Sequence, residues 1–191
     1  MSPLRSLLPT LAAAAALGAC LPALGQQQLV AAQSSVSFTA KQMGVPLQGQ
    51  FKKFDAQVAF DPAKLATSRI RFTVDTGSAT MGARETDAEL PKPVWFNVVQ
   101  FPQATFESSS IKALGGGKFD VAGKLTIKGT AVNVNVPVQL AQSGSTTTAT
   151  GSLPLKRLAF KIGDGEWADT SMVADEVQVK FSLALTGVGK L

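Results

Sequence analysis

The chain of 191 residues contains no histidine and no tyrosine, and its only cysteine is Cys20. Without histidine it cannot build a Ser-His-Asp triad, a cysteine–histidine pair, or most of the zinc and non-haem iron sites known in proteins. A single cysteine has no partner in the chain for a disulfide, so we expect the apolar core to stabilise the fold. We therefore predict a protein that is not an enzyme and that uses no metal and no cofactor.

A long hydrophobic run is also missing. The apolar stretch Leu7–Leu17 is too short for a membrane-spanning helix, which needs about 20 apolar residues. It follows a basic residue and precedes Ala23-Leu24-Gly25, whose small residues suit a signal peptidase. We predict that residues 1–25 are a cleaved signal peptide and that residues 26–191 form one exported, periplasmic domain. Leu17-Gly18-Ala19-Cys20 resembles a bacterial lipobox, so anchoring through a lipidated Cys20 stays open as the alternative.

Basic residues are in modest excess, with a net charge of +5. They occur as scattered singles and as short groups such as Lys52-Lys53 and Lys156-Arg157. Proteins that bind nucleic acid gather their basic residues on one face or along one helix. No such block is present, so we predict no nucleic-acid partner.

What the sequence does contain is alternation of apolar and polar residues, the period of a strand with one buried face. A further alternation begins at Leu153 and continues, after a one-residue slip, to Ile162. Together with the clearest alternations, it predicts eight or nine strands separated by turn residues. The clearest alternations cover residues 36–40, 70–74, 119–127, 132–138 and 177–185.

Residues 82–96 break this alternation. The segment Ala83–Leu90 has the composition of one or two helical turns, which Pro91 and Pro93 would end. Within it, Asp87 is expected to cap the helix or to anchor a loop. The prediction is a short helical crossover between two strands.

Meandering strands that are polar on one face must bury the other face in a sandwich or in a closed barrel. A barrel of about eight strands is wide enough to be filled by side chains or to hold one small ligand. The small inward residues Gly49, Ala104, Ser108 and Gly123 favour a cavity, as do 11 phenylalanines that bring apolar rings without hydroxyl groups. Periodicity alone leaves a solid core equally open, because small residues also permit close strand packing.

Several blocks resemble, in order and spacing, the YceI family of exported, lipocalin-like bacterial proteins associated with polyisoprenoid binding. The likeness extends from about Ser34 to Leu185. The blocks that carry it are Ser35-Val36-Ser37-Phe38, Gly49-Gln50-Phe51, Asp87-Ala88-Glu89-Leu90, Trp95-Phe96-Asn97-Val98, Phe101-Pro102-Gln103-Ala104-Thr105-Phe106-Glu107-Ser108 and Gly123-Lys124-Leu125-Thr126-Ile127-Lys128-Gly129-Thr130.

The resemblance implies an all-β fold: an eight-stranded antiparallel, lipocalin-like β-barrel with a short helical crossover and a lipid chain inside. Members of the family carry histidines in the first strand and in the crossover helix. Here Gln42 and Glu89 stand at such positions. No role that requires an imidazole is therefore expected.

The expected ligand-binding residues fall into two groups. Arg84 and Arg157 are expected to meet a polar headgroup at the cavity mouth, since cations form strong hydrogen bonds with phosphate or carbonyl oxygens. Met81 is expected to provide adaptable apolar lining. The wall facing the lipid tail is expected to consist of Phe38, Phe51, Phe60, Phe72, Trp95, Phe96, Phe106, Phe119, Leu125, Ile127, Phe160 and Phe181.

The function that these observations favour is binding without chemistry. We expect an exported protein that sequesters or carries an amphiphilic isoprenoid lipid, of the polyprenyl or quinone type, in an apolar barrel cavity. The alternative is a solid barrel that carries no lipid and docks on a membrane or a redox partner through its loops. The sequence leaves open whether the barrel forms a homodimer.

Overall fold

The computed structural model describes residues 27–191, in which β-strands dominate. The predictions of a signal peptide and of a lipobox at Cys20 lie outside the described residues. Within residues 27–191 there are eleven strands, of which β1 (Gln28–Leu29) and β6 (Ala79–Thr80) have only two residues. The long strands are β2 (Ser35–Gln42), β3 (Val45–Phe51), β4 (Phe54–Ala59), β5 (Arg69–Asp75), β7 (Gln103–Gly115), β8 (Lys118–Ile127), β9 (Thr130–Ser143), β10 (Thr146–Lys156) and β11 (Glu176–Thr186).

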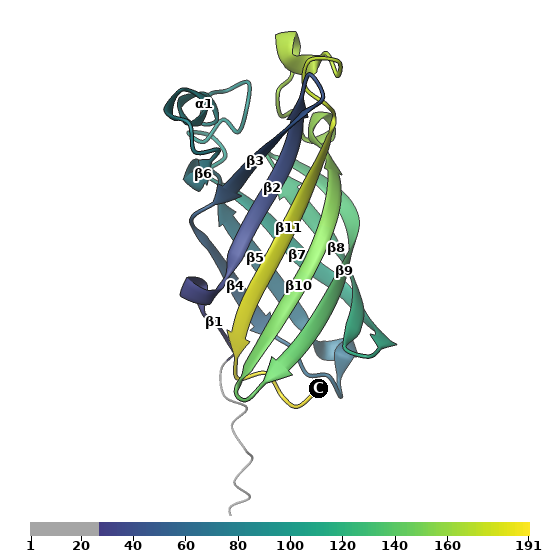
Figure 1. Ribbon diagram of the computed structural model, residues 1–191. Helices are drawn as coiled ribbons and strands as arrows, with labels where there is room; N and C mark the ends of the chain where they lie inside the picture. The colour runs from purple at the N-terminus through teal and green to yellow at the C-terminus, as the bar shows by residue number, and fades with distance from the viewer. Residues whose placement is uncertain (1–26) are drawn as a thin grey trace, which may run out of the picture.

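The strands form one antiparallel sheet that curls into a barrel (Figure 1). Its hydrogen-bonded order is β4-β5-β7-β8-β9-β10-β11-β2-β3-β6, and β1 pairs with β11. Only Lys52 and Lys53 separate β3 from β4, although β3 pairs with β2 and β4 pairs with β5. The chain itself therefore joins the two sides of the sheet. When β3 and β4 are counted as one bent strand, the barrel has the eight long strands that the sequence predicts.

The helical segments are short. The predicted crossover helix is confirmed as α1 (Arg84–Glu89), and the remaining helical elements are 3-10 helices. No helix in residues 27–191 has both the length and the apolar character needed to cross a membrane. The alternation predicted to continue from Leu153 to Ile162 ends at Lys156, where the 3-10 helix η4 (Arg157–Phe160) begins. The other 3-10 helices are η1 (Ala31–Gln33), η2 (Leu65–Thr67), η3 (Thr76–Ser78) and η5 (Gly165–Ala168).

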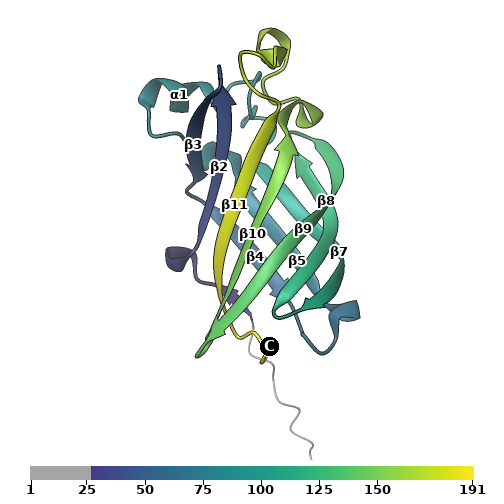
Figure 2. The same cartoon turned by 45° about the vertical axis from the view of Figure 1, so that its right-hand side comes forward.

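The two ends of the barrel are built differently (Figures 1 and 2). At the upper end in both views, the β2–β3 turn lies beside the long segment between β10 and β11, with α1 to one side. The lower end carries the β9–β10 turn and the C-terminus. We call the first of these the α1 end.

Away from the α1 end, the barrel interior is tightly packed. The rings of Phe60 and Phe119 meet edge to face, with their centroids 5.3 Å apart at an interplanar angle of 87°, a favourable geometry for aromatic pairs. Strand ends from both sides of the barrel supply the rest of this cluster, which forms the floor of the interior. Its buried members are Phe60, Ile111, Phe119, Val121, Leu140, Ala149 and Leu185.

Replacement of Phe60 with alanine is expected to lower the free energy of unfolding by about 3–5 kcal/mol, because the floor would lose a packed ring and gain a cavity. Phe72→Ala is the matched control, since Phe72 also faces the interior but is only half-buried. Its loss should cost about half as much. Urea denaturation compares the two variants, and equal losses would contradict the division of the interior into a packed floor and an open upper part.

Candidate functional site

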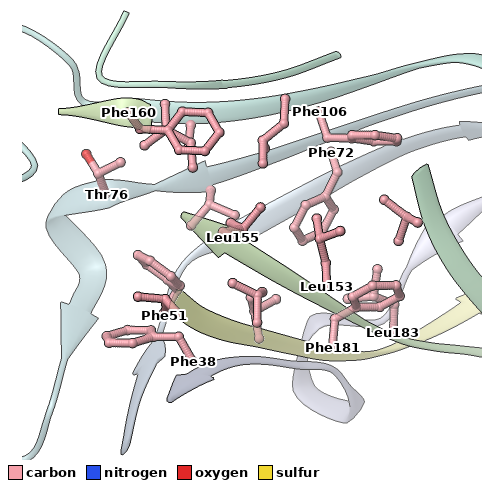
Figure 3. Close-up of a pocket in the computed structure, with 18 of the residues that line it drawn as sticks. Phe38, Phe51, Phe72, Thr76, Phe106, Leu153, Leu155, Phe160, Phe181 and Leu183 are labelled. Atoms are coloured by element: carbon pink, nitrogen blue, oxygen red, sulfur yellow. The ribbon is translucent and has the colours of Figure 1, made fainter. Parts of the chain in front are cut away.

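A cavity of about 590 Å³ occupies the barrel interior above the floor. Figure 3 shows side chains from opposite walls, among them Phe51, Phe72, Leu155 and Phe181, pointing toward a shared central space. All nine long strands contribute lining residues, and α1 and the segment between β10 and β11 contribute more. The volume lies within the range of about 300–1,000 Å³ that is typical of ligand-binding pockets.

Several side chains of the cavity wall are only partly buried. Phe51, Phe106, Leu153 and Phe181 are half-buried although they belong to the inward face and line the cavity. Their accessible surface therefore faces the void. Periodicity alone leaves open either a solid core or a cavity, and the structure has a cavity.

Three glycines on the inward face lie under phenylalanine rings of neighbouring strands. Gly49 is paired with Phe38 and Gly151 with Phe181. A Cβ added at either glycine would lie 2.2 or 2.3 Å from the ring, which is too close for any side chain. Gly123 has the same relation to Phe106, at 2.5 Å. The expectation that Gly49 and Gly123 leave open space is therefore wrong, because phenylalanine rings occupy the space over both. All three glycines let the rings lie along the wall, so that less of each ring projects into the lumen.

Fourteen of the fifteen residues expected to bind a ligand line this cavity. The exception is Arg84, whose exposed side chain on α1 is not part of the lining. Floor residues such as Phe60 and Phe119 border the cavity from below, whereas Trp95 and Phe96 border it beside α1. The lining residues are Phe38, Phe51, Phe60, Phe72, Met81, Trp95, Phe96, Phe106, Phe119, Leu125, Ile127, Arg157, Phe160 and Phe181.

Arg157 has a different role from the expected headgroup contact. Its guanidinium is buried, and it donates five hydrogen bonds of 2.5–3.1 Å to backbone carbonyls. Burial lowers the pKa of Arg157, and the nearby Asp175 carboxylate opposes this shift. Because all five N–H groups of an arginine are then used, Arg157 holds the end of the barrel together and has no donor left for a ligand. Its acceptors are the carbonyls of Ile162, Gly163, Trp167, Val173 and Ala174.

Two loops meet above the cavity through a tryptophan pair. The ring centroids of Trp95 and Trp167 lie 5.6 Å apart. Gly163, with φ of 63°, donates a backbone hydrogen bond to Val94 (2.8 Å). Lys128 from the β8–β9 turn donates to the Val94 carbonyl as well, at 3.2 Å, and burial lowers the pKa of its ammonium. These contacts form a cap that joins the α1 segment to the segment after β10.

Asp87 anchors α1 to the barrel, as the sequence predicts. One carboxylate oxygen accepts a hydrogen bond from the Thr80 hydroxyl and the other from the Met81 backbone N–H, both at 2.6 Å. The Thr80 contact, followed by the Met81 contact, holds the pKa of Asp87 below its ordinary value of 3.8. Both carboxylate oxygens of Asp87 are therefore used to fasten the crossover segment to the residues around β6.

Polar lining side chains gather beside α1 at the mouth of the cavity. Lys41 and Gln42 end β2, and Glu85, Thr86 and Glu89 come from α1. The sequence does not predict these residues as ligand-binding, because no periodic pattern marks the rim of a cavity. The only signal for this region was that Gln42 and Glu89 stand where members of the family carry histidine.

The polar side chains of the described residues are not grouped as metal ligands. In residues 27–191, no three His, Cys, Asp or Glu side chains are grouped to hold a metal ion. Every buried side-chain nitrogen and oxygen in this range has a hydrogen-bond partner. The cavity lining is mostly apolar, with polar side chains gathered beside α1.

Arg157→Lys should lower the free energy of unfolding by about 3 kcal/mol, because a lysine cannot replace five donors and buried carbonyls would lose their partners. Hydrogen exchange should accelerate in residues 162–174. Arg84→Lys, at an exposed position, is the control and should change neither quantity. Unaltered hydrogen exchange of residues 162–174 in Arg157→Lys would show that Arg157 does not hold this segment in place.

Asp87→Asn should reduce thermal stability at neutral pH, and the deficit should shrink as the solution is acidified. The folded-state pKa lies below the ordinary value of 3.8, so the carboxylate's contribution is complete above that value and is lost as pH falls through the folded pKa. Melting curves from pH 7 to about pH 3 test this. A deficit independent of pH would show that the charge of Asp87 is irrelevant.

Comparison with known proteins agrees with this architecture. Residues 28–185 match the YceI-like domain model. The chain is 34% identical over 139 residues to a UPF0312 protein of Azotobacter vinelandii, covering 68% of this chain and 69% of that protein. It is also 34% identical over 110 residues to protein YceI of Salmonella arizonae, covering 57% of each chain.

Solved structures give the same picture. BcnA of Burkholderia cenocepacia superposes with a TM-score of 0.79 at 52% identity, covering 82% of this chain and 98% of that one. A polyisoprenoid binding domain from Saccharophagus degradans has the same fold, with a TM-score of 0.66 at 16% identity over 84% of this chain and 98% of that one. Sequence blocks, barrel topology and these matches together show that the chain belongs to the YceI family.

Proposed function

We propose that this protein binds the tail of an isoprenoid lipid, of the polyprenyl or quinone type, inside the barrel and acts as a carrier or store for it in the periplasm. The observation that carries the proposal is the apolar cavity of about 590 Å³ above a packed floor. An apolar cavity with polar lining residues beside α1 suits an amphiphile that enters tail first. The binding of a polyisoprenoid by the structural relative from Saccharophagus degradans supports the same class of ligand.

Apolar burial alone provides enough free energy for this role. Each methylene transferred from water contributes about 0.8 kcal/mol. About ten buried methylene equivalents would therefore give about 8 kcal/mol, which corresponds to micromolar affinity before the cost of ordering the tail. A flexible prenyl chain needs no specific polar contact along the wall, and the wall offers almost none.

The polar rim beside α1 is the part suited to a headgroup. Gln42 and Thr86 can both donate and accept hydrogen bonds, and Lys41 can donate. Glu89 lies 2.5 Å from the exposed Lys92, so its charge is partly balanced. In this proposal the headgroup's oxygens meet Lys41, Gln42 and Thr86, while Arg157 serves only the protein.

Catalysis is not part of the proposal. The chain has no histidine, and the carboxylate with the lowered pKa beside the cavity, Asp87, is used to fasten α1. A carrier needs only a reversible equilibrium between bound and free lipid, for which a preformed cavity is sufficient.

Titration with a detergent-dispersed ubiquinone tests the proposal, since both tryptophans of the chain, Trp95 and Trp167, line the cavity and their fluorescence should be quenched. The double variant Ala40→Phe/Ala104→Phe adds two rings at cavity-lining positions and should weaken binding at least about ten-fold, a change of about 1.4 kcal/mol. Filling a void costs less stability than overpacking a full core, so the variant should remain folded.

The matched control is Lys124→Phe/Lys180→Phe, which adds the same two rings at exposed positions on β8 and β11. It should bind as the wild type does. A non-absorbing polyprenol should reverse the quenching by competition. If the cavity-filling variant bound ubiquinone as well as the control does, the ligand would lie elsewhere and the proposal would be wrong.

A further inference from the structure

We propose that the tip of the β2–β3 hairpin, together with Met172 in the segment before β11, is a membrane-docking edge that places the cavity mouth on a lipid bilayer. This inference rests on the proposed function, because the bilayer is where an isoprenoid cargo would be collected or delivered. The edge consists of Met43, Val45 and Met172.

Exposed apolar side chains are concentrated at this edge. Six large apolar side chains are exposed in residues 27–191, and three of them are Met43 (69% exposed), Val45 (59%) and Met172 (41%). The backbone N–H of Met43 donates to the Met172 carbonyl at 2.8 Å. Gln42, which pairs with Val45, also forms a β-bridge with Val173. The β2–β3 turn and the segment before β11, which carry these three residues, therefore form one structural unit at the α1 end (Figures 1 and 2).

Met43 has a left-handed backbone conformation that methionine rarely adopts. The two turn residues, Met43 and Gly44, have φ of 50° and 81°, which corresponds to a type I′ hairpin turn. Asparagine, aspartate or glycine is strongly preferred at the first of these positions. A residue that breaks a local rule without a packing benefit points to a function for its side chain, and Met43 is exposed rather than packed.

The edge continues the apolar lining of the cavity. Val45, Leu47, Gly49 and Phe51 alternate along β3 and so share its inward face. Leu47 and Phe51 line the cavity, and Val45 extends the same track beyond the rim into solvent. A prenyl chain leaving a bilayer would find apolar contacts from the hairpin tip to the cavity.

The charges beside the edge are of both signs. Lys41 lies two residues before Met43. Asp169 lies three residues before Met172, whose backbone N–H donates to the Asp169 backbone carbonyl at 3.2 Å. Attraction to anionic lipids requires a cluster of basic residues, so the docking proposed here is apolar insertion. It should therefore proceed on zwitterionic lipid and be insensitive to salt, which screens only charge interactions.

Sedimentation with phosphatidylcholine vesicles tests the inference. The protein without its predicted signal peptide, residues 26–191, is expected to bind weakly and reversibly, equally well at low and high salt. The triple variant Met43→Asn/Val45→Thr/Met172→Ser should lower the vesicle partition coefficient at least about ten-fold, since it removes the side chains that enter the bilayer. Met43→Asn alone should lower partitioning while raising the unfolding temperature, because asparagine suits the turn. A purely structural role for Met43 predicts the opposite effect on stability.

Leu114→Ser is the matched control. Leu114 is 65% exposed near the β7–β8 turn, away from the α1 end, and its loss should leave partitioning unchanged. Absence of wild-type binding to the vesicles, equal binding by the triple variant, or an equal loss in Leu114→Ser would overturn the inference. So would a dimer formed without lipid and abolished by the triple variant, since a second copy would then cover the edge.

Ubiquinone titration of the triple variant in detergent separates the two proposals. Normal quenching with lost vesicle binding is the expected result. If the wild-type protein shows normal quenching but does not bind vesicles, only the membrane-docking inference is wrong. If it binds vesicles but shows no quenching, the proposed isoprenoid ligand is wrong.

Discussion

The structure depends on one steric constraint: at the α1 end, the barrel is wider than its inward side chains can fill. Interiors of globular proteins are normally close-packed, and the floor residues around Phe60 and Phe119 are buried. Above the floor, phenylalanines that face inward, such as Phe51 and Phe72, are only half-buried and line the cavity. The pairing of Phe38 with Gly49 and of Phe181 with Gly151 contributes to this width, because each ring occupies the space over a glycine.

An unfilled barrel has less packing to stabilise its open end, and polar contacts take over there. Arg157 joins five backbone carbonyls around one guanidinium. Asp87 fastens α1 through Thr80 and Met81, and Trp95 packs against Trp167 above the cavity. Arg157 and Asp87 are thus committed to shaping the α1 end. The polar lining groups outside these contacts include Lys41, Gln42 and Thr86 beside α1, and most of the cavity wall is apolar.

Alternation was sufficient for most of the strands and for most of the cavity wall, whereas the closed eight-stranded barrel was implied by the resemblance to the YceI family. Period two assigns Phe38, Phe72 and Phe181 to the inward face whatever their partners are. It could not decide whether inward residues meet across the axis, since that depends on barrel width. It also could not give the role of Arg157, whose acceptors are backbone carbonyls of a loop without periodicity, nor the rim at Lys41 and Thr86. The fit of Phe38 over Gly49 required the strand register, which alternation leaves undetermined.

Mass spectrometry of an organic extract of the purified, full-length protein tests the central claim most directly. An occupied barrel should release a single class of isoprenoid in near-stoichiometric amount, and that class should disappear from the extract when the cavity is filled by mutation. An extract with only the bulk phospholipids of the host, in amounts that do not follow the protein, would contradict the account and leave a barrel whose void has no cargo.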